Sequence, residues 1–222
     1  DLSAGEMLGQ ILAANRAEER IGNVVLMGSG EPLDNYDNTV RFLRLLREKG
    51  GIELSLRSVS LSTCGIAPRI RNLADEGLPV TLSVSLHAPD DALRQTMMPV
   101  ASAYPLEDLL KACRYYIEKT GRRVIFEYAL IGGVNGSADH ARRLSSLLRG
   151  MQCHVNLIPL NPVPERGMRG STEAEIAAFE RVLAERHISV TRRREMGRDI
   201  SGACGQLRRR YLHTTTEGSD AP

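Results

Sequence analysis

Residues 24–32, with the sequence VVLMGSGEP, decide the fold. Their four leading apolar residues predict a buried strand over residues 23–27. The strand ends in Gly28-Ser29-Gly30, where two glycines let the backbone approach a ligand closely. Pro32 then biases Glu31 toward an extended conformation. Because ligands bind beyond the carboxyl ends of parallel strands, we expect a ligand-accessible carboxylate at Glu31. A plain turn with a surface glutamate is the alternative.

Strand and helix patterns alternate on both sides of this segment. Short apolar runs predict strands over residues 23–27, 57–63, 80–86, 124–131, 154–160 and 188–192. Amphipathic helical patterns lie between them, and Ser3–Glu6 and Thr172–Glu175 are capping boxes. Alternation of this kind predicts an α/β fold with parallel strands, as a barrel or an open sheet. The pattern begins on a helix, so we expect a partial barrel that lacks its first strand and leaves a parallel edge exposed.

The composition is that of a globular protein. The chain has 222 residues, of which 42% are hydrophobic and 25% charged, enough for one large domain. Aromatic residues make up only 4%, with no Trp, so aromatic stacking cannot dominate a binding surface. We find no apolar run of membrane-spanning length and no leader, and therefore expect a cytoplasmic protein without a membrane partner.

The four cysteines are too widely separated in sequence for a zinc or iron–sulfur motif. They are Cys64, Cys113, Cys153 and Cys204. Nor does their spacing suggest a disulfide framework, which agrees with a reducing compartment. Cys113 falls on the apolar face of a predicted helix and is expected in the core.

The charge is uneven along the chain. The net charge is only +2, but residues 181–210 contain nine arginines and three acidic residues. Such a stripe is typical either of a phosphate-backbone contact or of a solvated helix face, and the sequence leaves both open.

Small or polar residues follow the predicted strands at their carboxyl ends. Those that could meet at one edge of the sheet are Gly28-Ser29-Gly30-Glu31, Ser62-Thr63-Cys64-Gly65, Ser85-Leu86-His87 and Asn161. This set suits a small, zwitterionic, ribose-bearing ligand, with the carboxylate of Glu31 for an ammonium group. The alternatives are ordinary turn residues and, for His87, a helix-capping role.

A second candidate site is Cys204, which lies between Ala203 and Gly205 in a Gly-rich loop flanked by arginines. Such surroundings lower a thiol pKa and favour a nucleophile. An inert loop cysteine is the alternative.

Several of these segments together resemble one family. The strings VVLMGSGEPLDNYDN, LSTCG, VTLSVSLHAP, NLIPLNP and GRDISGACGQLR are similar to the RlmN/Cfr family of radical S-adenosylmethionine (SAM) RNA methyltransferases. The resemblance runs from Asp1 to about Leu207 and is nearest to the RlmN branch, the 23S rRNA adenine-C2 methyltransferases.

The resemblance implies a partial (β/α)6 radical SAM barrel, with a core over residues 1–210 and a disordered tail over 211–222. It implies SAM contacts at Gly30, Glu31, Ser62, Ser85, Leu86, His87 and Asn161. It also implies that Cys204 is the S-methylcysteine intermediate. In the family a [4Fe–4S] cluster cleaves a second SAM to a 5′-deoxyadenosyl radical, which activates the methyl group for addition to adenine C2. The implied partners are 23S rRNA, tRNA in some members, and an electron donor such as flavodoxin. We expect a monomer.

The chain also departs from the family. No CxxxCxxC motif occurs in it, so no metal ligands are predicted here, and we expect the chain alone to be inactive. Ser29 and Leu160 replace the Met and Trp usual in the family. Three alternatives stay open: Cfr-like methylation of adenine C8, a non-catalytic RNA-binding remnant, and a metal-free lyase or aldolase. A lyase or aldolase of this kind needs a Schiff-base lysine near a strand end, and the sequence places none there.

Overall fold

The computed structural model describes residues 1–17, 20–28, 30–160 and 169–193. The elements in chain order are α1 (Ala4–Ala17), β1 (Val24–Leu26), α2 (Tyr36–Leu46), the 3-10 helix η1 (Leu56–Ser58), β2 (Val59–Thr63), α3 (Ala67–Asp75), β3 (Thr81–Ser85), α4 (Asp91–Met97), the 3-10 helix η2 (Pro99–Ser102), α5 (Leu106–Thr120), β4 (Val124–Leu130), α6 (Ala138–Leu147), β5 (Cys153–Pro159), α7 (Glu173–Glu185) and β6 (Val190–Arg192). All six predicted strands are present, most of them one or two residues shorter than predicted.

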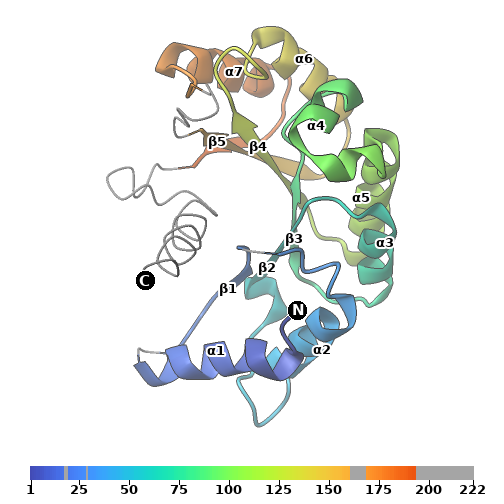
Figure 1. Ribbon diagram of the computed structural model, residues 1–222, viewed down its shortest axis with the longest axis vertical. Helices are drawn as coiled ribbons and strands as arrows, with labels where there is room; N and C mark the ends of the chain where they lie inside the picture. Colours follow the sequence, from blue (N-terminus) through green and yellow to red (C-terminus); the bar gives the residue numbers. More distant parts are fainter. Residues whose placement is uncertain (18–19, 29, 161–168, 194–222) are drawn as a thin grey trace, which may run out of the picture.

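The strands form one sheet in which β1 to β6 pair in chain order, every pair parallel. The sheet is curved, and helices α2 to α7 lie around its outer side (Figure 1). Within the described residues β1 and β6 pair only with β2 and β5, so the barrel is open. The predicted α/β fold with an incomplete parallel barrel is therefore confirmed.

The register of the strands separates two faces of the sheet. Leu61, Leu82 and Val124 are register partners, and their side chains are fully buried under the helices. The alternate residues face the concave side, because successive side chains of a strand point to opposite faces. On that side Ser62 pairs with Ser83, and Ser85 pairs with Glu127. The concave face of the central strands is therefore largely polar.

Most of the helix caps predicted from the sequence are present in the structure. Ser3 and Glu6 exchange hydrogen bonds at the start of α1, and Thr172 and Glu175 do the same at α7, as both capping boxes predict. Cys113 is completely buried, as expected. The sequence pattern favours Asp37 as the N-cap of the second helix, but α2 begins two residues before that cap would place it, with Asn35 at the N-cap position.

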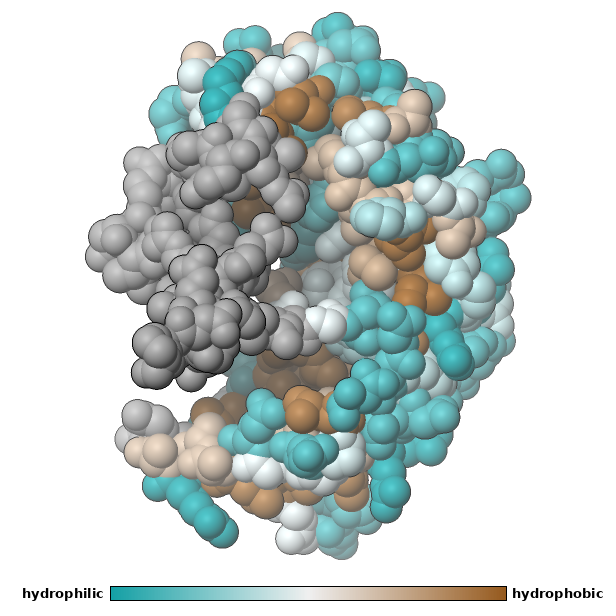
Figure 2. All heavy atoms as spheres, in the orientation of Figure 1, coloured by the Kyte–Doolittle hydropathy of each residue, from teal (hydrophilic) through white to brown (hydrophobic). Residues whose placement is uncertain are grey.

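Hydrophilic residues cover most of the outer surface, and the molecule is hollowed where the curved sheet opens (Figure 2). Two large apolar side chains at edge strand β1 are strongly exposed, with Val25 at 57% and Met27 at 44%. No helix within the described ranges is both long and apolar enough to cross a bilayer.

Candidate functional site at the carboxyl ends of the strands

The structure brings together the first three predicted strand ends. Leu26 is the register partner of Leu61, and Thr63 is the partner of Val84. The carboxyl ends of β1, β2 and β3 therefore lie side by side at one edge of the sheet. Glu31, Ser62 and Ser85 occupy these ends and are each partly buried. The sequence-based expectation that these residues share one region is confirmed.

Two backbone amides hold the Glu31 carboxylate. Oε2 accepts a hydrogen bond from the Cys64 amide at 2.6 Å, and Oε1 accepts one from the Leu33 amide at 3.0 Å. Each carboxylate oxygen has a second lone-pair site, so both can still accept a hydrogen bond from a cationic ligand. Gly28 and Gly30 have φ angles of 154° and 105°, which a side chain would strain. Glu31 is thus a fixed carboxylate and not a mobile surface residue.

Cys64, which follows β2, is not suited to nucleophilic chemistry. Burial raises the pKa of the Cys64 thiol to about 12. The hydrogen bond between the thiol and Glu31, and the negative charge of Glu31, act in the same direction. The thiol therefore stays protonated at neutral pH, because the nucleophile is the thiolate. The part that Cys64 contributes to the site is its backbone.

Arg94 of α4 is a site residue that sequence reasoning missed. Its side chain is fully buried, and its guanidinium donates to four backbone carbonyls. The acceptors are Cys64 O at 2.9 Å, Ser85 O at 3.2 Å, Leu86 O at 3.3 Å and Tyr104 O at 3.3 Å. Three of them, Cys64, Ser85 and Leu86, lie at or just beyond the carboxyl ends of β2 and β3, so Arg94 fixes these two strand ends relative to each other.

Gly65 lets the β2 loop pack onto Arg94. Its φ angle is 105°, and an added Cβ would lie 3.1 Å from Arg94 Nη2 and 3.1 Å from Leu109 Cδ1. Only glycine fits this conformation and spacing without strain.

His87 is held in one tautomer beyond the end of β3. The Ala129 amide donates to His87 Nδ1 at 3.0 Å, so Nδ1 carries no proton and Nε2 carries the ring N–H. Burial, aided by the nearby Arg94 charge, lowers the pKa of His87 to about 4. Its φ angle is 59°. His87 does not cap a helix, since Asp90 is the residue that caps α4.

Asn135, also missed from the sequence, holds the His87 backbone. Asn135 is fully buried and donates through Nδ2 to His87 O at 2.8 Å and to Ala129 O at 2.6 Å. Its Oδ1 accepts a hydrogen bond from the Ile131 amide at 2.8 Å. The side chain therefore joins the loop after β3 to the end of β4.

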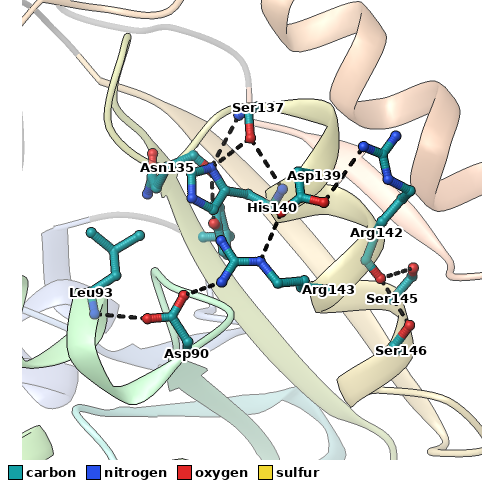
Figure 3. Close-up of polar contacts among 11 residues, drawn as sticks. Asp90, Leu93, Asn135, Ser137, Asp139, His140, Arg142, Arg143, Ser145 and Ser146 are labelled. Carbon is teal, nitrogen blue, oxygen red and sulfur yellow. Dashed lines mark hydrogen bonds and ion pairs between the residues drawn. The ribbon is translucent and has the colours of Figure 1, made fainter.

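Ion pairs extend this support to the outer helices (Figure 3). Asp90 accepts a hydrogen bond from the Leu93 amide at 2.9 Å and pairs with Arg143 of α6 at 2.8 Å. Arg143 also pairs with Asp139 at 3.1 Å. Ser137 and His140 form the capping box of α6. This network fixes α4, which carries Arg94, against α6.

The concave face beneath the strand ends carries a further polar group. Glu127 of β4 is only 6% exposed, and its Oε2 accepts a hydrogen bond from Asn156 Nδ2 of β5 at 2.8 Å. Burial raises the pKa of Glu127. A charged residue inside the apolar run 124–131 was the sequence signal that could have identified it.

Two predicted site residues, Asn161 and Cys204, lie outside the described residues, as do Ser29 and the tail after residue 193. Within the described part of the chain, no three His, Cys, Asp or Glu side chains come together as a metal site. The described residues thus do not fit an iron–sulfur cluster.

Comparison with known proteins places these observations in a family context. Residues 1–144 match the family model described as the Radical SAM superfamily. A curated protein of Lachnospira eligens named "Probable dual-specificity RNA methyltransferase RlmN" is 51% identical over 98% of this chain. Its counterpart in Alkaliphilus oremlandii is 54% identical over 96%. The chain spans 62% of the length of both relatives.

A solved structure, a radical SAM methyltransferase from Sphaerobacter thermophilus, has the same fold. It superimposes with a TM-score of 0.87 at 47% identity, covering 92% of this chain and 61% of that one. A domain of a pyruvate-formate lyase-activating enzyme from Bacteroides vulgatus is 20% identical with a TM-score of 0.62, a likeness of fold alone.

Proposed function

The chain belongs to the radical SAM superfamily, and from that premise we propose that the edge formed by β1, β2 and β3 binds SAM. The observation that carries the proposal is the fixed Glu31 carboxylate beside two strand ends held by Arg94. Glu31 would accept hydrogen bonds from the ammonium group of the ligand, since the backbone amides that orient it leave lone pairs free.

The other proposed contacts suit the remaining groups of SAM. Ser62 and Ser85 offer hydroxyls, which can donate to or accept from a ribose or a carboxylate. His87 offers an Nε2–H donor because its Nδ1 is already engaged. Gly30, Leu86 and Asn161 are proposed as further contacts on the family resemblance; Leu86 itself is fully buried, and its amide and carbonyl groups are hydrogen-bonded within the protein.

The proposed reaction is methylation of adenine C2 in 23S rRNA, and in tRNA, through an S-methyl group on Cys204. When bound, SAM would supply that methyl group. The family motifs and the names of the relatives support this, and those names favour the C2 product over the Cfr-like C8 product. Analysis of the methylated nucleoside made by the full-length protein distinguishes the two positions.

The chain alone is proposed not to complete the reaction. It contains no CxxxCxxC motif, and its described residues gather no set of cluster ligands. Its own proposed part is to bind and orient SAM and to present Cys204. In the described part of the arginine stripe, Arg181 pairs with Glu185 and Arg192 with Glu173. Salt-dependent RNA affinity without SAM turnover would favour the RNA-binding remnant instead.

The experiment compares two ligands on the Glu31→Gln variant by isothermal titration calorimetry. SAM carries the ammonium group, whereas 5′-methylthioadenosine lacks the whole amino-acid part. Loss of a hydrogen bond between charged groups should weaken SAM binding by about tenfold or more. Binding of 5′-methylthioadenosine should not change.

The matched control is Glu48→Gln, an exposed glutamate after α2, which should bind both ligands as the wild type does. Equal weakening of both ligands by Glu31→Gln would show that Glu31 only supports the fold. Absence of SAM binding to the wild-type chain would contradict the proposal itself.

A further inference from the structure

The feature of interest is a buried carboxyl group on the concave face of the sheet. Glu127 is the fourth residue of β4 and is 6% exposed. Its register partners are Ser85 of β3 and Asn156 of β5. Adjacent strands lie about 4.8 Å apart, so Glu127 is the immediate neighbour of the proposed SAM contact Ser85 on the same face.

The Glu127 carboxyl group is held by the neighbouring strand β5. Asn156 Nδ2 donates to Oε2. A buried carboxylate is costly unless its oxygens are hydrogen-bonded. Burial raises the pKa of Glu127, and this effect outweighs the stabilisation of the carboxylate by Asn156 and Arg193. The group is therefore an acceptor suited to a ligand donor.

The backbone of Glu127 belongs to the same site. Its carbonyl oxygen accepts hydrogen bonds from the Leu86 amide at 3.0 Å and from the His87 amide at 3.4 Å. Glu127 therefore contacts the segment after β3 through its backbone, while its side chain lies on the face that carries Ser85. A ligand that contacts Ser85 from the concave side would lie next to the Glu127 carboxyl group.

We propose that Glu127 accepts a hydrogen bond from a ribose hydroxyl of the adenosyl group, beside Ser85. The inference rests on the proposed function and assigns a contact that the sequence did not indicate. A ribose offers adjacent hydroxyl donors, and acidic side chains accept from these hydroxyls in other nucleotide sites. The ammonium group of the ligand is already matched by Glu31, which follows β1, three strands away from β4, so the two carboxyl groups would contact different parts of the ligand.

The test is a cycle in which the residue and the hydroxyl are removed separately and together. Wild type and Glu127→Gln are titrated with S-adenosylhomocysteine and with its 2′-deoxy and 3′-deoxy analogues. We expect the wild type to bind at least one analogue about tenfold more weakly than the parent, the typical effect of losing a hydrogen bond to a charged acceptor. Glu127→Gln should bind S-adenosylhomocysteine about tenfold more weakly and discriminate far less against that analogue.

Several outcomes separate the inference from its premise. If Glu127→Gln weakens all three ligands by one common factor, the residue does not contact the ribose and the inference is overturned. A wild type that binds all three equally overturns it without any variant. If Glu127→Gln changes only the affinity for an adenosine oligonucleotide, the hydroxyl belongs to RNA and the assignment to SAM is wrong. A wild type that binds none of the three contradicts the proposed function as well.

Discussion

Replacing Arg94 with methionine should destabilise the protein strongly, because this buried guanidinium joins two strand ends. It donates four hydrogen bonds, at 2.9, 3.2, 3.3 and 3.3 Å. At about 1.5 kcal/mol each, the low end for charged groups and suited to the longer bonds, their loss costs about 6 kcal/mol. Methionine carries no charge, so the variant avoids the free-energy cost of burying the guanidinium, which offsets about 3 kcal/mol of this loss. We therefore expect a net loss of about 3 kcal/mol in the free energy of unfolding.

The assay for Arg94→Met is urea unfolding followed by circular dichroism, because the chain has no tryptophan. Arg41→Met is the matched control on the exposed face of α2 and should change stability by less than about 0.5 kcal/mol. Arg94→Lys keeps the charge but not the planar fork, so it should fall between the wild type and Arg94→Met. If Arg94→Met lies within about 1 kcal/mol of the wild type, the four hydrogen bonds do not hold the strand ends, and the reasoning fails.

Three further predictions concern Gly65, His87 and the cysteines. Gly65→Ala should lower the free energy of unfolding by about 1–3 kcal/mol, because a Cβ there meets Arg94 and Leu109 at a positive φ. The control Gly9→Ala, in open space on α1, should raise the free energy of unfolding by up to about 1 kcal/mol. Equal effects of the two substitutions in urea titrations would contradict this prediction. The pKa of His87 is lowered from about 6.5 to about 4 in the folded protein. As the pH falls, this histidine is therefore protonated in the unfolded chain before it is protonated in the folded one. Its contribution to the free energy of unfolding should be fully present above pH ~6.5 and decline by about 2–3 kcal/mol toward pH 4. His87→Asn should lack this part of the decline in urea titrations across that range, and an unchanged slope would refute the assignment. The pKa values of Cys64, Cys113 and Cys153 are raised to about 12, 12 and 11, so iodoacetamide at pH ~8 should alkylate Cys204 first; mass spectrometry showing Cys64 modified first would contradict this order.

The alternation of patterns predicted the fold well, because each buried strand depends on a short local run of apolar residues. The run 24–27 and the capping boxes at Ser3 and Thr172 are signals of this local kind. They identified every strand and the parallel order of the sheet. Helix entry at α2 was less well predicted, because the turn after Glu31 is set by its hydrogen bonds to Leu33 and Cys64, which lie beyond the reach of a local pattern.

The candidate site was predictable only where a residue directly follows a strand. Glu31, Ser62, Ser85 and His87 could be placed because parallel strands end at one edge. Arg94 and Asn135 could not be placed, since their roles arise from contacts with backbone groups distant in sequence. Glu127 carried a visible signal, a charge within an apolar strand, but its face is defined only by the register with Ser85.

The central claim is that the edge formed by β1, β2 and β3 binds SAM through Glu31. The most direct test is a crystal structure of this chain soaked with S-adenosylhomocysteine. We expect the ligand ammonium group within hydrogen-bond distance of the Glu31 carboxylate, with the ribose over Ser85. Ligand bound elsewhere, or bound here with its ammonium group turned away from Glu31, would contradict the claim.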